Sequence, residues 1–528
     1  MTAFSRWAGG AALFSALAAA NAATAAVDRA DLAEAYLAVD RAVAGAALSP
    51  EVLADVNRRF DAATLQFFQG RRAAAIGTLN EIVWSLRPAP PSTAERGLAS
   101  VKVTAQPPVI VAPAAAPGGD STIAEGRGRE GATARFTIER LFAAPELLGE
   151  RVVLRLVPPG GEGRPIVVGS VALPRDAGEP AATAPADAGD ADSQRGGADE
   201  AAARGSSSIA WSAPAGLVPG RWTIELTLGA TARAAGTLIV AREAPQRARE
   251  RLLEGLDRLL ASFDEAQLEE LAAAVASFRG RAGLLSDEPS RTESAQFLAD
   301  PQALIEELDL ELEAIARGAN PYAGRSGTYW RAIPAGALTL PVMVIAPPER
   351  ADPAPLVIAM HGAGGDERMF IDGYGAGAIA GLAQRHGAIV VAPRSTMLAT
   401  TPVYFDAIVE TLAAEYSIDP ARVYLVGHSM GGAAAASILR RRGDRIAASA
   451  AIASPMAFVP DADVPQLLIL GGLDRVTPAN AALRASIAGL AESGRPIELI
   501  ELADEGHTLI VGRSLPQVFE WCLSKRRE

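Results

Sequence analysis

The last two-fifths of the chain, residues 320–528, predict an α/β fold with a mostly parallel sheet flanked by helices. Short apolar runs alternate there with helical stretches such as Tyr404–Tyr416 and Ala433–Arg441. Several runs are apolar at every position, as in strands that are buried on both faces of a parallel sheet. The strand candidates are Leu340–Ala346, Leu356–Met360, Ala388–Ala392, Val423–Val426, Ala448–Ala453, Gln466–Leu470 and Ile497–Leu502.

A helical segment is expected first, over residues 28–90. Its apolar residues recur at a spacing of three to four, which predicts a small helical hairpin. Ser49 and Pro50 form a helix start, with Ser49 as the N-cap and Pro50 in the first turn. Nothing in this segment indicates a chemical role.

Two further segments separate these helices from the α/β unit. Residues 98–242 contain short β-rich runs, which predict a small β-sandwich in which Trp222 lies on the core face of the last alternating strand. Within it, residues 176–208 are mostly Ala, Gly, Asp and Ser, and we expect a disordered loop there. Residues 244–318 carry three apolar stripes at helical spacing, which predict a helical connector. Two candidate aromatics, Trp211 and Trp222, are too few for a polymer-binding platform, so a spacer role is favoured for the sandwich.

The composition is that of a globular protein with two to four domains, since 49% of the 528 residues are hydrophobic and 21% are charged. A net charge of -12 argues against nucleic acid as a partner. The chain has a single cysteine, Cys522, so no intramolecular disulfide can form. Cys522 lies in an apolar stretch, and we expect it to be a buried structural thiol.

The N-terminus resembles a secretory signal peptide, residues 1–22. Arg6 provides the positive charge, residues 8–20 are small and apolar, and Ala20-Asn21-Ala22 fits a cleavage site, with Ala23-Thr24-Ala25 as a second candidate. The run is shorter and less apolar than a membrane anchor. We therefore expect a secreted or periplasmic protein with no membrane span in the mature chain; the alternative is an alanine-rich helix that begins the first domain.

One motif carries the main chemical signal. The strand candidate Val423–Val426 is followed at once by Gly427-His428-Ser429-Met430-Gly431-Gly432 and then by an alanine-rich helix. A serine on such a sharp strand-to-helix turn has an exposed hydroxyl, and small flanking residues avoid collisions with the neighbouring strand and helix. Ser429 is therefore the predicted nucleophile.

A serine hydroxyl needs a base, and the four histidines all lie in this unit. His428 should point away from the Ser429 hydroxyl, and His386 ends a helix. His507 follows the last strand candidate and is the predicted base. Asp474 follows the preceding strand and comes between Ser429 and His507 in the chain, as the acid of such a triad should.

The remaining carboxyl and backbone groups have weaker signals. Asp504 and Glu505 share a short loop with His507, cannot easily reach its far nitrogen, and are expected to be solvated. The oxyanion-hole donors are predicted to be the N–H of Met430 and that of Ala363 or Gly364, in the glycine-rich turn after Leu356–Met360. His361 is expected to orient that turn.

These motifs resemble a known family. Residues 320–528 are similar to α/β-hydrolases of the polyhydroxybutyrate depolymerase, feruloyl esterase and prolyl-oligopeptidase-like group. The resemblance is carried by the stretch from Tyr416 to Gly432, by His361-Gly362 and the glycines after it, by Gly472-Leu473-Asp474 and by Gly506-His507. It implies the same triad and ester or peptide substrates. No long insertion separates the strands, so we expect a shallow, open site without a lid.

The function favoured by these observations is hydrolysis of carboxylic esters, small or polymeric, through an acyl-enzyme. A serine peptidase is the alternative hypothesis. A third hypothesis, a non-catalytic binding or envelope protein, is disfavoured because all three triad candidates are present. We expect no cofactor and no metal, because the histidines show no ligand spacing with carboxylates. The sequence does not specify the acyl group or the oligomeric state.

Overall fold

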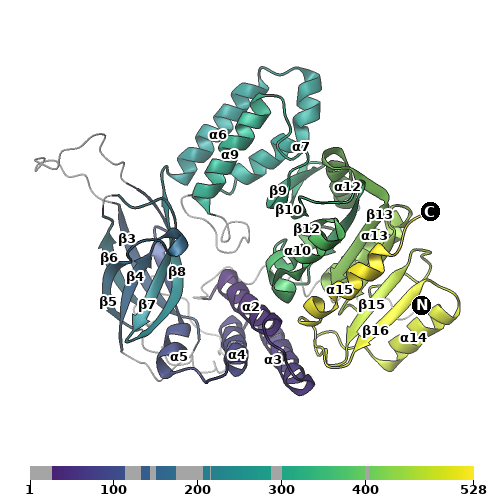
Figure 1. The fold of residues 1–528 in the computed structure, drawn as a ribbon, viewed down its shortest axis with the longest axis horizontal. Coiled ribbons are helices and arrows are strands. Elements are labelled where there is room, and N and C mark those ends of the chain that lie inside the picture. Colours follow the sequence, from purple (N-terminus) through teal and green to yellow (C-terminus); the bar gives the residue numbers. More distant parts are fainter. Residues whose placement is uncertain are drawn as a thin grey trace, which may run out of the picture.

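The computed structural model describes residues 27–112, 132–142, 150–173, 206–214, 216–286, 300–398 and 403–528. The expected signal peptide lies outside these residues, as does most of the loop expected over 176–208. Ser207 and Ser208, at the end of that loop, are described and lie in a strand, so the expected loop extends too far. The described elements form four neighbouring groups, which Figure 1 shows from the N-terminal helices in purple to the large sheet in green and yellow.

The N-terminal group consists of three helices, so the expected two-helix hairpin is wrong. They are α2 (Arg29–Ala44), α3 (Pro50–Phe68) and α4 (Arg72–Ser85). Ser49 caps α3 by accepting a hydrogen bond from the N–H of Val52, and Pro50 lies in the first turn, as predicted. Asp28 and Asp31 form a capping box at the start of α2. The apolar stripes of these helices pack on one another in a common core.

A β-sandwich follows the short helix α5 (Thr93–Ala99). One sheet has the order β1-β3-β6 and the other the order β2-β8-β7-β4-β5, and both contribute to one apolar core that contains Trp222. Lys102 on β1 forms a buried ion pair with Asp31 at 2.7 Å, which ties α2 to the sandwich. The strands are β1 (Val101–Gln106), β2 (Val109–Val111), β3 (Thr133–Arg140), β4 (Arg151–Val157), β5 (Ile166–Ala172), β6 (Ser207–Ser212), β7 (Gly220–Leu228) and β8 (Thr231–Ala241), with a 3-10 turn η3 (Pro159–Gly161).

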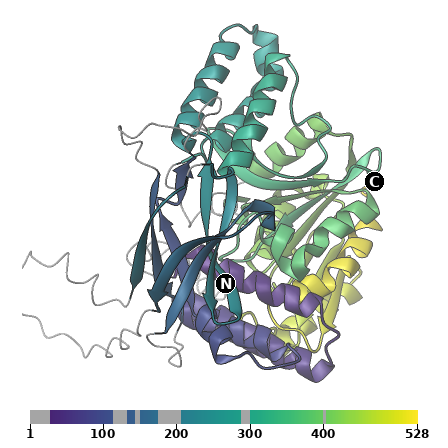
Figure 2. The same cartoon turned by 60° about the vertical axis from the view of Figure 1, so that its left-hand side comes forward.

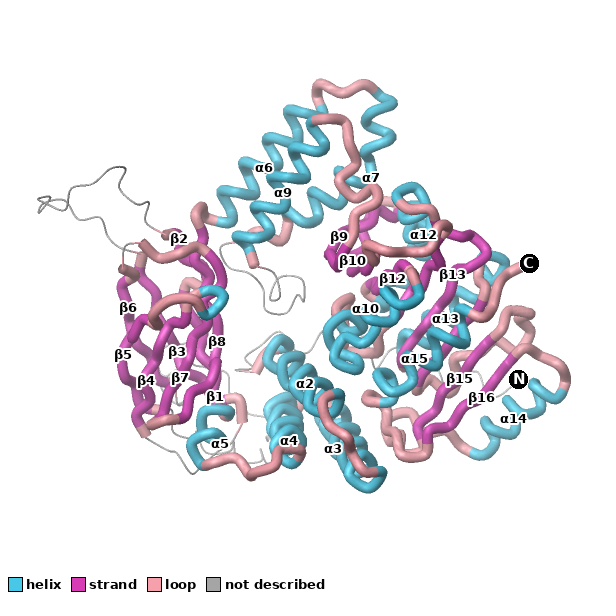
Figure 3. The backbone as a smooth tube through the Cα atoms, viewed as in Figure 1, coloured by secondary structure: helices cyan, strands magenta, loops and turns pink. Residues whose placement is uncertain are grey.

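The third group contains the helices α6 (Pro245–Leu260), α7 (Glu265–Ala282) and α9 (Pro301–Ala316), whose apolar stripes share one core. Figure 3 shows these helices between the sandwich and the large sheet. Ser277 on α7 donates a hydrogen bond to the carbonyl of Ala332 at 2.7 Å, which attaches this group to the first strand of that sheet.

The large sheet confirms the predicted fold class. Its order is β9-β10-β12-β11-β13-β14-β15-β16, and only β10 runs against the other seven strands. Each predicted strand is present, but the sequence analysis missed β9. The strands are β9 (Gly327–Ala335), β10 (Leu338–Ala346), β11 (Ala354–Met360), β12 (Ile389–Pro393), β13 (Ile418–His428), β14 (Ala448–Ile452), β15 (Gln466–Gly471) and β16 (Ile497–Leu502).

Alternate residues of these strands enter two apolar cores, one on each face, because side chains on a strand point to opposite sides in turn. The helices α10 and α15 cover one face, where Cys522 is buried as predicted, and α12 and α13 cover the other. The helices are α10 (Tyr374–His386), α11 (Ser395–Leu398), α12 (Val403–Glu415), α13 (Met430–Arg442), α14 (Ala481–Glu492) and α15 (Ile510–Leu523), with short turns η4 (Met369–Gly373) and η5 (Gly443–Arg445).

This topology brings four loops to one edge of the sheet. The loops after β11, β13, β15 and β16 all leave the carboxyl ends of parallel strands, where the sites of open α/β sheets are found. Figure 2 shows the N-terminal helices packed beside this unit rather than extended away from it. Among the described helices, none combines the length and the apolar character that a membrane crossing requires.

Candidate active site

Ser429 occupies a strained turn between β13 and α13. Its φ of 53° and ψ of -115° are unusual for a residue with a side chain. The turn is tight: a Cβ on Gly431 would lie 1.9 Å from the carbonyl oxygen of Met360, and a Cβ on Gly427 would lie 2.3 Å from the carbonyl oxygen of Gly431. Only glycine fits at these two positions, so the sequence around Ser429 is dictated by backbone contacts with β11 and α13.

The three residues predicted as a triad lie in one hydrogen-bonded line. Nε2 of His507 lies 3.1 Å from Oγ of Ser429, and Nδ1 of His507 lies 2.9 Å from Oδ2 of Asp474. His507 and Asp474 are buried, whereas Ser429 is partly exposed to the pocket described below. A histidine held in this way can accept the proton of the serine hydroxyl while the carboxylate stabilises the resulting imidazolium.

Asp474 is held in its charged form despite its burial. Its Oδ1 accepts hydrogen bonds from the N–H groups of Val476 and Thr477, each at 2.8 Å, and the Thr477 hydroxyl donates to Oδ2 at 2.9 Å. Burial alone would raise the pKa of Asp474, but the hydrogen bond and charge of His507, together with Thr477, outweigh burial and lower that pKa.

His428 does not reach the Ser429 hydroxyl and supports His507 instead. Its Nε2 lies 2.9 Å from the carbonyl oxygen of His507, so this nitrogen must carry the proton that it donates. Its Nδ1 then accepts the hydroxyl proton of Tyr374 at 2.6 Å, and the Tyr374 oxygen accepts the N–H of Gly362 at 3.3 Å. Burial lowers the pKa of His428 to about 3, so this chain of hydrogen bonds contains a neutral imidazole.

The predicted oxyanion residues lie around the same serine. Met430 is the first residue of α13, where backbone N–H groups have no partner within the helix. Ala363 and Gly364 line the pocket that contains Ser429. His361 orients their loop: Nε2 accepts the N–H of Ser395 at 3.0 Å, and Nδ1 donates to the carbonyl of Gly362 at 2.8 Å.

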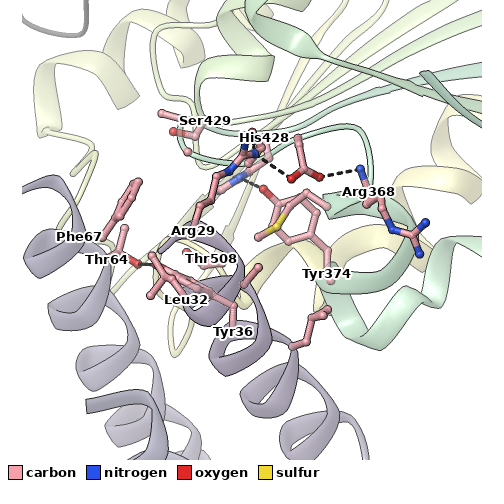
Figure 4. Close-up of a pocket in the computed structure, with 18 of the residues that line it drawn as sticks. Arg29, Leu32, Tyr36, Thr64, Phe67, Arg368, Tyr374, His428, Ser429 and Thr508 are labelled. Carbon is pink, nitrogen blue, oxygen red and sulfur yellow. Dashed lines mark hydrogen bonds and ion pairs between the residues drawn. The ribbon is translucent and has the colours of Figure 1, made fainter. Parts of the chain in front are cut away.

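The pocket in front of Ser429 is walled by the N-terminal helices. Figure 4 shows α2 and α3 on the side of the pocket opposite the serine turn, with Leu32, Tyr36 and Phe67 among the residues that line the pocket. The cavity has a volume of about 110 Å³, and its lining also includes Leu37, Phe68 and Met369. The expectation of a shallow site open to solvent is therefore wrong, because a segment more than 350 residues earlier in the chain forms one wall of the pocket that contains Ser429.

The N-terminal helices also contact the loop that carries Ala363 and Gly364. Arg29 at the start of α2 donates to the carbonyl of Gly365 and pairs with Asp366, both at 2.8 Å. A Cβ on Gly364, which has a φ of +80°, would lie 2.5 Å from the ring of Phe67. The sequence analysis found no chemical role in residues 28–90, and it did not predict that these helices line the pocket in front of Ser429.

Two polar residues of α3, which the sequence analysis missed, are buried against the loops of the triad. Asn57 and Asp61 lie one turn apart on the same face as Val56 and Phe60. The signal that could have revealed them is that two polar side chains interrupt the apolar stripe of this helix. Asn57 also explains why Glu505 is buried rather than solvated, contrary to expectation: Nδ2 of Asn57 donates to Oε2 of Glu505 at 3.1 Å. Asp504 is exposed, as expected.

A third carboxyl group, Asp40 on α2, is buried near the site. Its Oδ1 accepts the N–H of Gly375 at 3.2 Å, while its buried Oδ2 makes no hydrogen bond with the described residues. Burial raises the pKa of Asp40 to about 7, against a smaller lowering effect of the Gly375 N–H. At neutral pH and below, the folded protein therefore binds a proton that the unfolded chain releases above pH 4.

This carboxyl group should make stability fall with pH. The contribution of Asp40 is complete below its unfolded pKa and is lost as pH rises from about 4 to about 7. Asp40→Asn should remove this dependence, so its stability relative to the wild type should increase over that range by at most about 4 kcal/mol. Thermal unfolding of both proteins, followed by circular dichroism from pH 4 to pH 8, measures the difference. A difference that is constant with pH would contradict the assignment.

Comparison with known proteins gives matches among solved structures. No family model matches the chain. No curated protein matches it either. The S-formylglutathione hydrolase of Staphylococcus aureus is 15% identical, with a TM-score of 0.30, over 38% of this chain and 98% of that one. The S-formylglutathione hydrolase of Agrobacterium tumefaciens is 17% identical, with a TM-score of 0.32, over 38% and 96%. The feruloyl esterase module of Clostridium thermocellum, solved with sinapinate, is 12% identical, with a TM-score of 0.31, over 39% and 89%.

The C-terminal unit has the α/β-hydrolase fold. This follows from its own sheet order and from the serine turn between β13 and α13.

Proposed function

We propose that the chain is a serine hydrolase that cleaves carboxylic esters through an acyl-enzyme intermediate. The observation that carries this proposal is the line from Ser429 through His507 to Asp474, with hydrogen-bonding distances of 3.1 Å and 2.9 Å. A nucleophile, a base and an orienting acid in this order form a complete unit for acyl transfer.

The proposed reaction has two stages, formation of the acyl-enzyme and its hydrolysis. Oγ of Ser429 attacks the ester carbonyl, and its proton moves to Nε2 of His507 while Asp474 holds the proton on Nδ1. The carbonyl oxygen becomes negative and accepts hydrogen bonds from the N–H of Met430 and of Ala363 or Gly364. The tetrahedral intermediate expels the alcohol, which takes the proton from His507. A water molecule, deprotonated by the same histidine, then releases the acid and restores the serine.

The pocket supports an ester with an apolar group. Its lining includes aliphatic, aromatic and thioether side chains from α2, α3 and the loop before α10, together with charged side chains from α2 and that loop. Burial of an apolar substituent there provides binding energy.

Labelling with a fluorophosphonate probe tests the proposed function. The purified protein should react at Ser429, as identified by peptide mass mapping, and Ser429→Ala should not react. Hydrolysis of p-nitrophenyl esters in preference to peptide anilides would then support an esterase over a peptidase. A folded protein that does not react with the probe would overturn the triad and favour a non-catalytic role.

We also propose that the protein is exported, to the periplasm or the medium. The support is the N-terminal pattern of Arg6, the small apolar residues 8–20 and Ala20-Asn21-Ala22. The mass of the protein recovered from the producing cells checks this proposal, because cleavage after Ala22 removes the first 22 residues. An intact N-terminus on the recovered protein would contradict it.

A further inference from the structure

Helix α3 is hydrogen-bonded to both loops that carry the partners of Ser429. The carboxylate of Asp61 bridges them: Oδ1 accepts the N–H of His507 at 2.8 Å, and Oδ2 accepts the N–H of Arg475 at 3.0 Å. Arg475 directly follows Asp474 in the chain, so one side chain of α3 contacts the backbone of the base and that of the residue next to the acid. Asp61 is fully buried.

Asn57, one turn earlier on α3, holds the residues before His507. Its Oδ1 accepts the N–H of Gly506 at 2.9 Å, and its Nδ2 donates to the carbonyl of Asp504 at 3.0 Å as well as to the side chain of Glu505. Together, Asn57 and Asp61 contact every residue from Asp504 to His507. The loop has no regular structure of its own to fix its conformation.

The backbone of His507 is therefore held on two sides. Asp61 accepts its N–H, and His428 donates to its carbonyl oxygen at 2.9 Å. Both contacts are buried, where an unpaired backbone group is costly. These contacts set the direction in which the imidazole leaves the backbone. A small displacement of a catalytic group from its reactive position lowers the rate strongly.

A carboxylate is required at position 61 for a specific reason. Two N–H groups from different loops point at its two oxygens. An asparagine has one acceptor oxygen, so its amide N–H₂ would face the N–H of either His507 or Arg475. One loop would then lose its partner and move.

We propose that Asp61 and Asn57 are positioning residues for the triad, so that the N-terminal helices form part of the catalytic site rather than a separate domain. The proposal rests on the proposed function. It predicts a loss of turnover rather than of substrate affinity, because neither residue lines the pocket in front of Ser429.

Kinetics of Asp61→Asn and Asn57→Ala test this proposal. Each should lower kcat for a p-nitrophenyl ester by ~10²-fold with little change in KM, because the base is displaced while the pocket remains. The rate constant for fluorophosphonate labelling of Ser429 should fall in parallel. Asp55→Asn is the matched control: the same change on the same helix, at an exposed side chain whose ion pairs are on the surface. It should behave as the wild type.

The outcomes separate positioning from simple packing. Circular dichroism and thermal unfolding establish the folded fraction of each variant, and kcat is expressed per folded molecule. Wild-type kcat in folded Asp61→Asn would overturn the proposal. If Asp61→Asn does not fold, the test rests on Asn57→Ala, which leaves the Asp61 bridge intact. An unchanged kcat in Asn57→Ala would overturn the proposal. A lower kcat with a constant KM would support it. A wild-type protein that does not react with the probe would overturn the proposed function itself.

Discussion

Ser429→Ala and His507→Ala should each lower kcat for ester hydrolysis by ~10⁶-fold, and the double variant should be no slower than either single one. The reason is that Oγ of Ser429 is activated only through Nε2 of His507, 3.1 Å away, so loss of either group removes the whole unit. Initial rates with a p-nitrophenyl ester measure all three variants. His386→Ala is the control, because His386 lies at the end of α10, where its ring neighbours Phe519.

The non-additivity is the critical part of this prediction. If the losses in the two single variants multiply in the double variant, then Ser429 and His507 act independently, and the acyl-enzyme mechanism would be contradicted. Residual activity common to all three variants would come from the oxyanion donors and from binding.

Asp474→Asn should lower kcat by ~10⁴-fold while leaving the fold intact. The N–H groups of Val476 and Thr477 both point at Oδ1, so the asparagine oxygen must stay on that side. Its amide N–H₂ then faces Nδ1 of His507 and donates to it. The imidazole proton is forced onto Nε2, which can no longer accept the proton of Ser429.

Asp504→Asn is the control for this substitution. Asp504 is the exposed carboxyl group nearest to His507 in sequence, and its side chain has no part in the line from Ser429 to Asp474. Ester hydrolysis by the two variants, with circular dichroism as a check on folding, distinguishes them. A large loss in Asp504→Asn with little loss in Asp474→Asn would reassign the acid.

The proximity of Ser429, Asp474 and His507 could be predicted from sequence because each of them lies in the segment that follows an apolar strand run. The carboxyl ends of β13, β15 and β16 lie at the same edge of the sheet. Residues that follow these strands are therefore close together, and this proximity does not depend on the helices between the strands. The glycines around Ser429 added a second signal, since a Cβ at Gly431 or Gly427 would lie only 1.9 Å or 2.3 Å from a backbone oxygen.

The wall of the pocket could not be predicted in this way. An amphipathic stripe shows that a helix packs against another part of the protein, but it does not identify that part. The sequence of residues 28–90 therefore gave no indication that these helices lie over Ser429. Strand β9 was missed for a related reason. Its central Arg331 is completely buried and paired with Glu415, and a charged residue in the middle of a strand does not read as core unless its partner is known.

The bond from Asp61 to the N–H of His507 joins residues 446 positions apart. Asp61 and His507 meet only when the N-terminal helices pack against the large sheet, and bringing together two such distant residues costs loop-closure entropy. A partly folded or truncated molecule would hold the serine motif without the helices that complete its surroundings. If the chain has the proposed function, hydrolysis therefore depends on the contact between α3 and the loop after β16, which lie near opposite ends of the described chain.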